Sequence, residues 1–191
     1  MSSVSLPGKV RARCTADMRR RGRLAVAFAA GLAAVAVSAT PAGAAGGSVE
    51  GPEPVPAPPF LLPAGEVCDF PLAGTFPVNE QQAYVLRDAD GSVRAEYVTG
   101  RLVGRFTNTA TGETVERDLS GSGVVTYRSD GSQRFTAVGA AAIGFHTGDR
   151  PANIFEVNGA RSVVVVDFAA DGRRTRLVQG GPYEDLCATL S

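Results

Sequence analysis

The stretch RLVGRFTNTATGETVERDLSGSG, Arg101 to Gly123, decides the fold class because polar and apolar residues alternate on both sides of a short turn. Leu102 and Phe106 share one face of its first half, and Val115 and Leu119 share one face of its second half. The intervening TATGE has the glycine and small polar residues that favour a chain reversal. Because alternation with period two is typical of half-buried strands, this stretch predicts a β-hairpin with one solvent-exposed and one buried face.

The same pattern extends through the rest of the chain. Turn sequences with glycine after Asp or Asn recur at short intervals between alternating runs: DADGS (88–92), RSDGS (128–132), VNGA (157–160) and AADGR (169–173). The runs amount to about nine strands. Since short connections favour pairing between neighbours, we expect an all-β, antiparallel up-and-down meander that closes into a small β-barrel of about eight strands. A two-sheet β-sandwich is the alternative.

One predicted strand is apolar on both faces. Ser162 to Phe168 reads SVVVVDF. Such a strand is either covered on both sides or exposed where two copies of the chain meet. Homo-oligomer formation through Ser162 to Phe168 is therefore one expectation.

The first 44 residues have the features of a secretory signal peptide. A basic cluster at Arg19 to Arg23 precedes an apolar run of 14 residues, Leu24 to Val37, and the small residues AGA end at Ala44. Met18 lies directly before the basic cluster, so residues 1–17 are a candidate for a mis-assigned start. We expect cleavage after Ala44.

The same segment predicts the route of export. Arg23 stands where a twin-arginine signal takes an apolar residue, so the general secretory route is favoured. The apolar run is shorter than the ~20 residues that span a bilayer. No stable membrane anchor is expected after cleavage, and the protein is predicted to be secreted and extracellular.

Proline dominates the segment after the predicted cleavage site. Ala45 to Pro63 reads AGGSVEGPEPVPAPPFLLP and contains six prolines, which remove backbone donors and favour an extended chain. We expect a flexible linker over 45–65 and a single disulfide-closed β domain over 66–191.

Two cysteines remain after cleavage, Cys68 and Cys187, one near each end of the predicted domain. In an exported chain an even pair predicts a disulfide. A redox role has less support because the sequence has no C-x-x-C motif. Closing a loop of this length is expected to stabilise the fold by about 4–5 kcal/mol.

The charge balance narrows the choice of partners. Residues 45–191 contain 12 Arg, no Lys and 18 acidic residues, a net charge of −6. Binding to nucleic acid depends on neutralising phosphates, so a nucleic-acid partner is not expected.

Catalytic motifs are sparse. His146 is the only histidine of the chain, so a His-rich zinc site cannot form, and the sequence predicts no metal and no cofactor. A Ser-His-Asp site would combine His146 with Asp149, but no nucleophile-elbow motif supplies the serine. A solvated loop histidine is the favoured interpretation.

Arg117 is a charged residue at a position where the alternation predicts a buried one. It alternates in phase with Val115 and Leu119, so it is predicted to point toward the dry side, where an unpaired guanidinium is costly. An interior salt bridge and a position at a barrel mouth are two explanations. A third is that Arg117 binds an anionic or carbonyl-bearing ligand in a barrel cavity, with Tyr84 or Tyr127 as further candidates.

Residues 99 to 132, TGRLVGRFTNTATGETVERDLSGSGVVTYRSDGS, followed by EDLCATLS at 184–191, resemble a group of small secreted actinobacterial proteins of unknown function. The resemblance extends roughly from Cys68 to Ser191 and implies a compact β domain with a cysteine near each end. Cys68 and Cys187 match that pattern. The segment GAAAIGFHTGDRPANIF, 139–155, departs from it, because a more aromatic strand is expected there.

Two classes of function follow. The first is a non-catalytic secreted β domain that binds a small apolar molecule or a cell-surface component. The second is a barrel-cavity enzyme of the isomerase or cyclase type, similar to allene oxide cyclase by analogy of fold alone. A cavity that holds Arg117, Tyr84 or Tyr127 would favour the enzyme.

Overall fold

A computed structural model describes residues 46–191, and the signal peptide predicted over 1–44 lies outside this part of the chain. The described residues form fourteen β-strands and one short helix, and every strand pair is antiparallel. The prediction of an all-β antiparallel meander is therefore confirmed.

The strands form three sheets. Sheet A has the order β1-β4-β5-β8-β9-β12-β13, with β1 (Ser48–Pro54), β4 (Gln82–Arg87), β5 (Val93–Thr99), β8 (Ser122–Tyr127), β9 (Gln133–Val138), β12 (Val163–Phe168) and β13 (Arg174–Gly180). Sheet B has the order β2-β3-β6-β7, with β2 (Phe60–Leu62), β3 (Leu72–Asn79), β6 (Leu102–Asn108) and β7 (Thr114–Asp118). Sheet C has the order β10-β11-β14, with β10 (Ala141–Phe145), β11 (Ile154–Asn158) and β14 (Tyr183–Asp185), and helix α1 (Leu186–Thr189) follows it.

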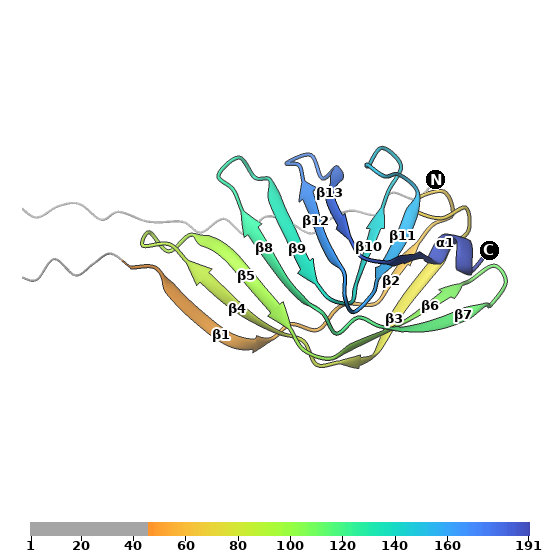
Figure 1. The fold of residues 1–191 in the computed structure, drawn as a ribbon, viewed down its shortest axis with the longest axis horizontal. Helices are drawn as coiled ribbons and strands as arrows, with labels where there is room; N and C mark the ends of the chain where they lie inside the picture. Colours follow the sequence, from red (N-terminus) through yellow and green to blue (C-terminus); the bar gives the residue numbers. More distant parts are fainter. Residues whose placement is uncertain (1–45) are drawn as a thin grey trace, which may run out of the picture. The chain divides into compact units, whose positions relative to one another are not determined.

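Where two consecutive strands belong to different sheets, the connection between them is often short, and the two strands resemble one long strand bent near its middle (Figure 1). Only Gly100 and Arg101 separate β5 in sheet A from β6 in sheet B. Gly100 has a φ of 127°, and a Cβ at this position would lie 2.3 Å from the carbonyl oxygen of Glu80, so the bend requires glycine. These bends carry the meander back and forth between sheet A and the other two sheets.

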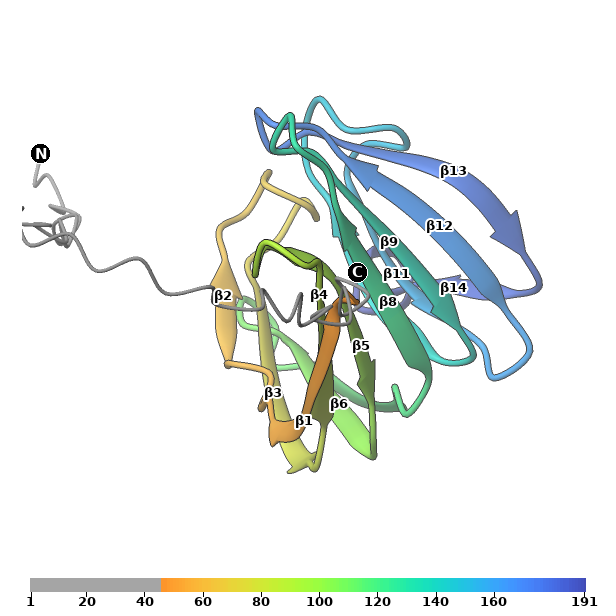
Figure 2. The same cartoon turned by 90° about the vertical axis from the view of Figure 1, so that its left-hand side faces the viewer.

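The expected closed barrel is not formed by residues 46–191. β1 and β13 are the two edges of sheet A and do not pair with each other, and sheets B and C have edges of their own. The bends divide the meander among three separate sheets, so no single ladder runs around the domain. Figure 2 shows sheet A beside the strands of the other sheets.

Sheet C packs on both of its faces. Phe155 and Val157 of β11 lie in one apolar cluster with Phe106 of sheet B. Ile154, on the opposite face of β11, packs against a second cluster that includes Val166 of sheet A. Sheet C thus lies between apolar side chains of sheet B and apolar side chains of sheet A.

The hairpin from Arg101 to Gly123 forms as predicted. β6 and β7 pair with Phe106 opposite Val115 and Gly104 opposite Arg117. Leu102 and Phe106 are buried, in agreement with the alternation of the sequence.

The proline-rich segment is part of the sheets, so the prediction of a flexible linker over 45–65 is wrong for the residues described. β1 pairs with β4, and β2 pairs with β3. Both are edge strands, and an edge strand such as β1 tolerates proline where the missing N–H would face solvent. The ring of Phe60 packs among aromatic residues, with centroid distances of 5.8 Å to Phe155 and 6.4 Å to Phe106.

The disulfide between Cys68 and Cys187 is confirmed, with 5.2 Å between the two Cα atoms. It joins the segment before β3 to helix α1. Val67, Leu186 and Leu190 are fully buried around it. The bond therefore ties the β2–β3 connection to helix α1 within one apolar cluster.

Candidate functional site

A cleft of about 420 Å³ lies between the inner face of sheet A and sheet B, beside the edge of sheet C. It opens to solvent and is lined mainly by apolar side chains from all three sheets. Five of them are phenylalanines: Phe60, Phe76, Phe106, Phe135 and Phe155. Pockets of this volume with an apolar lining are typical of sites for small molecules.

Small residues keep this aromatic cleft open. Gly123 on β8, Ala137 on β9 and Ala142 on β10 line it. A Cβ at Gly123 would lie 2.6 Å from the ring of Phe135, so a larger residue there would displace that ring. The bends and the edge strand β10 thus place small residues where the sheets would otherwise fill the space.

The aromatic cleft contains few polar groups. Gln81 and Ser122 are the polar residues of its lining, and the Ser122 side chain points to the outer face of sheet A with Tyr97. The hydroxyl of Ser122 accepts a hydrogen bond from the Tyr97 hydroxyl at 3.2 Å and lies 3.0 Å from the Thr99 hydroxyl. Ser122 is thus already engaged, and the lining offers no acid-base pair.

Arg117 does not line the aromatic cleft. Its guanidinium binds the carboxylate of Glu184 on β14, with 2.6 Å from Nε to Oε2 and 2.7 Å from Nη2 to Oε1. This hydrogen bond raises the pKa of Arg117 and lowers the pKa of Glu184. Of the three explanations for Arg117, the structure contains a salt bridge, but both side chains are about one-third exposed and the pair is not interior.

Tyr84 and Tyr127 also lie outside the aromatic cleft. Tyr84 packs against Tyr97 on the outer face of sheet A, with 6.1 Å between the ring centroids. Tyr127 lies opposite Gln133 at the turn end of sheet A. Burial, reinforced by the carboxylate of Glu96, raises the pKa of Tyr127.

His146 and Asp149 lie close together but not as a catalytic pair. The imidazole Nδ1 lies 3.0 Å from a carboxylate oxygen of Glu66. Asp149 is buried and accepts the backbone N–H of His146 at 2.6 Å and that of Arg174 at 2.7 Å. Asp149 therefore organises the β10–β11 loop through backbone donors.

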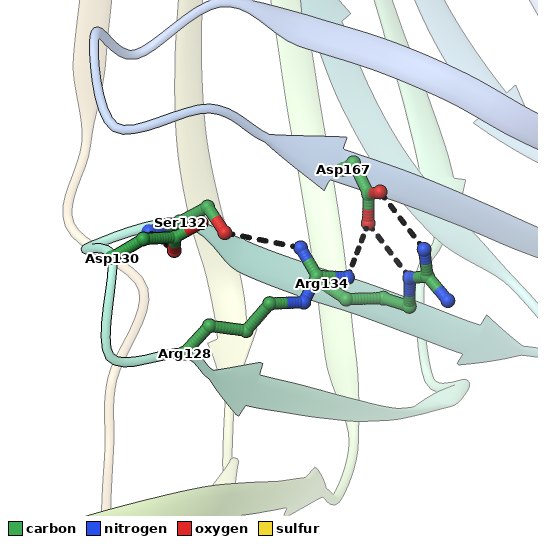
Figure 3. Close-up of polar contacts among 5 residues, drawn as sticks. All are labelled: Arg128, Asp130, Ser132, Arg134 and Asp167. Atoms are coloured by element: carbon green, nitrogen blue, oxygen red, sulfur yellow. Dashed lines mark hydrogen bonds and ion pairs between the residues drawn. The ribbon is translucent and has the colours of Figure 1, made fainter.

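A cluster of charged and polar side chains lies at the turn end of sheet A (Figure 3). The carboxylate of Asp167 on β12 accepts hydrogen bonds from Nε of Arg134 at 2.7 Å and from Nη2 of Arg128 at 3.2 Å. The bond to Arg134, followed by that to Arg128, lowers the pKa of Asp167 to about 2. Asp167 thus stays ionised and neutralised by its two partners near neutral pH.

A buried polar cluster between β11 and β13 was not predicted from the sequence. Glu156 is fully buried and forms an ion pair with Arg176, whose guanidinium lies 5.2 Å from the ring centroid of Tyr183. Next to it, Nε2 of Gln179 donates to Oδ1 of Asn158 at 2.8 Å. None of these residues lines the aromatic cleft. The alternation of IFEVN already places Glu156 and Asn158 on one face, but their partners depend on how the sheets pack.

β12 has one covered face and one exposed face. Val164 and Val166 are fully buried, whereas Val163 is 38% exposed. Val138 and Val178, on the neighbouring strands, are also exposed on the outer face. Self-association through Ser162 to Phe168 stays a prediction.

Within residues 46–191, no three His, Cys, Asp or Glu side chains gather as ligands for a metal ion. The described part also has no helix with the length and apolarity needed to cross a lipid bilayer.

No protein-family model, curated protein sequence or solved structure gives a significant match to this chain.

Proposed function

We propose that this chain is a secreted, non-catalytic binding domain that takes up a small apolar molecule in the aromatic cleft. The observation that carries the proposal is the cleft of about 420 Å³ with five phenylalanines in its lining. Aromatic surface that is exposed to water in an open cavity is unfavourable, and a ligand that covers this surface lowers the free energy of the complex. The disulfide is consistent with an oxidising, extracellular location.

The barrel-cavity enzyme has less support. The aromatic cleft contains none of the candidate groups Arg117, Tyr84, Tyr127, His146 and Asp149. General acid–base catalysis requires a titratable group within hydrogen-bond reach of the substrate. Gln81 and Ser122 do not supply one at neutral pH.

The test is titration of the purified domain with N-phenyl-1-naphthylamine, a probe whose fluorescence rises in apolar surroundings. We expect saturable binding to the wild-type domain. Ala142→Phe, which places a ring in the aromatic cleft, should weaken binding at least tenfold. Ala170→Phe is the matched control, because Ala170 is exposed in the β12–β13 turn and should leave binding unchanged.

Circular dichroism of each variant separates loss of binding from loss of fold. Binding of the probe to folded Ala142→Phe with wild-type affinity would contradict the proposal. Native mass spectrometry of protein secreted by its own host provides an independent measurement, because a ligand held in the aromatic cleft should appear as an added mass.

A further inference from the structure

The aromatic cleft is the first of three adjoining hollows. It shares Phe135, Ala142 and Gly144 with a second hollow of about 340 Å³. The second hollow shares Phe168 and Arg174 with a third, of about 420 Å³, at the turn end of the sheet. The three hollows therefore follow one another from the phenylalanines to the hairpin tips.

The chemistry of the lining changes along these three adjoining hollows, which together are called the groove. Among the described residues, no charged side chain lines the aromatic cleft, whereas the hollow at the turn end has four arginines: Arg128, Arg150, Arg173 and Arg174. Asp167 is the acidic residue of that hollow, and it is held by Arg134 and Arg128. In a domain with more acidic than basic residues, the turn end of the groove is a local excess of positive charge.

Two of these arginines have no carboxylate partner among residues 46–191. Nine of the twelve arginines in the described part of the chain form an ion pair with Asp or Glu, and Arg150, Arg161 and Arg174 do not. Arg150 and Arg174 both line the hollow at the turn end. Arg161 does not line any of the three hollows.

Arg174 is fixed at the junction between the second and third hollows. Its Nη1 donates to the carbonyl oxygen of Gly144, and its guanidinium lies 5.6 Å from the ring centroid of Phe168. Its side chain is half-buried, and the nearby carboxylate of Asp149 is occupied by backbone N–H groups. A guanidinium held in this way offers its remaining N–H groups to an anion at a small entropic cost.

We propose that the ligand of this groove is an amphiphile with one anionic head group, a carboxylate or a phosphate. The head group binds Arg174 and Arg150, and the apolar chain runs past Phe135 into the aromatic cleft. From Gln133, in the second hollow, to Ala137, in the aromatic cleft, β9 covers about 13 Å, a length that an extended hydrocarbon chain spans. This inference rests on the proposed function, because it names the ligand class of the same cleft.

The test compares three ligands that share one chain: hexadecanoate, hexadecyl phosphate and uncharged hexadecanol. Displacement of N-phenyl-1-naphthylamine from the domain is measured for each ligand below the concentration at which that ligand aggregates. We expect the wild-type domain to bind both anions about tenfold more tightly than the alcohol, as a charge-assisted hydrogen bond predicts. Arg174→Gln should remove this preference and leave binding of hexadecanol unchanged.

Arg161→Gln is the matched control, because Arg161 also has no ion-pair partner in the described residues but is exposed outside the groove. It should keep the preference for anions. If Arg174→Gln does not fold, Arg150→Gln replaces it, since Arg150 is exposed. This variant should weaken binding of the anions and spare hexadecanol.

The outcomes separate the two proposals. If hexadecanol binds as tightly as hexadecanoate to the wild-type domain, the anionic head group is wrong and the apolar cleft stands. If no chain displaces the probe, or if the probe itself does not bind, the proposed function fails as well. Arginine-dependent co-sedimentation with phosphatidylglycerol vesicles would overturn the free ligand in favour of a membrane surface.

Discussion

The guanidinium of Arg117 on β7 and the carboxylate of Glu184 on β14 form a two-point pair, 2.6 Å and 2.7 Å between the bonded atoms, that joins sheet B to sheet C. Glu184 also accepts a hydrogen bond from the hydroxyl of Thr189 at 2.8 Å, in helix α1. The pair thus connects the central hairpin to the C-terminal segment. Arg117 is therefore explained by a contact between sheets.

Removing either partner of this pair should lower stability modestly. Since both side chains are about one-third exposed, we expect Arg117→Met and Glu184→Gln each to cost about 1 kcal/mol, with little further loss in the double variant. Urea unfolding of all four proteins gives the coupling. Because the folded-state pKa of Glu184 is lowered, the contribution is present above the ordinary glutamate pKa and is lost as pH falls through the lowered value. Strictly additive losses would contradict the pair.

Asp167 predicts a second pH dependence. Its pKa is lowered from 3.8 to about 2 by Arg134 and Arg128, so the folded state gains stability above pH 4 and loses it as pH falls toward 2. Asp167→Asn removes this gain, and its deficit in unfolding free energy should shrink between pH 5 and pH 2, as followed by thermal melts. The control is Asp69→Asn, an exposed carboxylate without an ion pair in the described residues. A deficit that is independent of pH would exclude this linkage.

Adjacent residues of β2 test whether the proline-rich segment belongs to the folded domain. Phe60 packs between Phe76, Phe106 and Phe155, so Phe60→Ala should cost about 2–3 kcal/mol. Leu61 is 64% exposed on the other face, and Leu61→Ala should cost less than about 0.5 kcal/mol. Chemical denaturation measures both. Equal losses of stability for Phe60→Ala and Leu61→Ala would indicate that residues 45–65 are a linker and not part of the folded domain.

Local chemistry accounts for the parts of the fold that the sequence predicts. The alternation from Arg101 to Gly123 places Phe106 inward, and each Asp-Gly turn contains its own hydrogen bonds. Asp130, for example, accepts the backbone N–H of Ser132 at 2.9 Å. The cysteine pair follows from their number and the export signal. None of these features depends on how the sheets pack.

The features that the sequence does not predict depend on contacts between distant segments. Gly100 reads as a turn glycine, yet it bends one strand from sheet A into sheet B. The prolines of β1 read as a linker because their tolerance depends on an edge position. The aromatic cleft brings together Phe60 and Phe155, which are 95 residues apart in the sequence, and no local sequence pattern predicts this contact.

The disulfide closes a loop with a sequence separation of 119 residues. In the chain-entropy description such a loop contributes about 4–5 kcal/mol. Replacing Cys68 and Cys187 with serine should therefore lower the urea midpoint strongly and make unfolding insensitive to reductant, whereas the wild-type domain should shift to a lower midpoint when it is reduced. A wild-type midpoint that is equal with and without reductant would show that the bond adds no stability.

The buried ion pair of Glu156 and Arg176 gives the sharpest contrast between an interior and a surface pair. Glu156 is fully buried on β11, and the side chain of Arg176 on β13 is 20% exposed, so Glu156→Gln leaves a largely buried guanidinium without a counter-charge. We expect a loss of about 3–5 kcal/mol, and a smaller loss when Arg176→Met accompanies Glu156→Met. Glu116→Gln is the control, because Glu116 pairs with Arg105 at about half exposure and should cost less than about 1 kcal/mol. Equilibrium unfolding in urea measures all variants, and equal losses for Glu156→Gln and Glu116→Gln would show that the interior pair is as well solvated as the surface one.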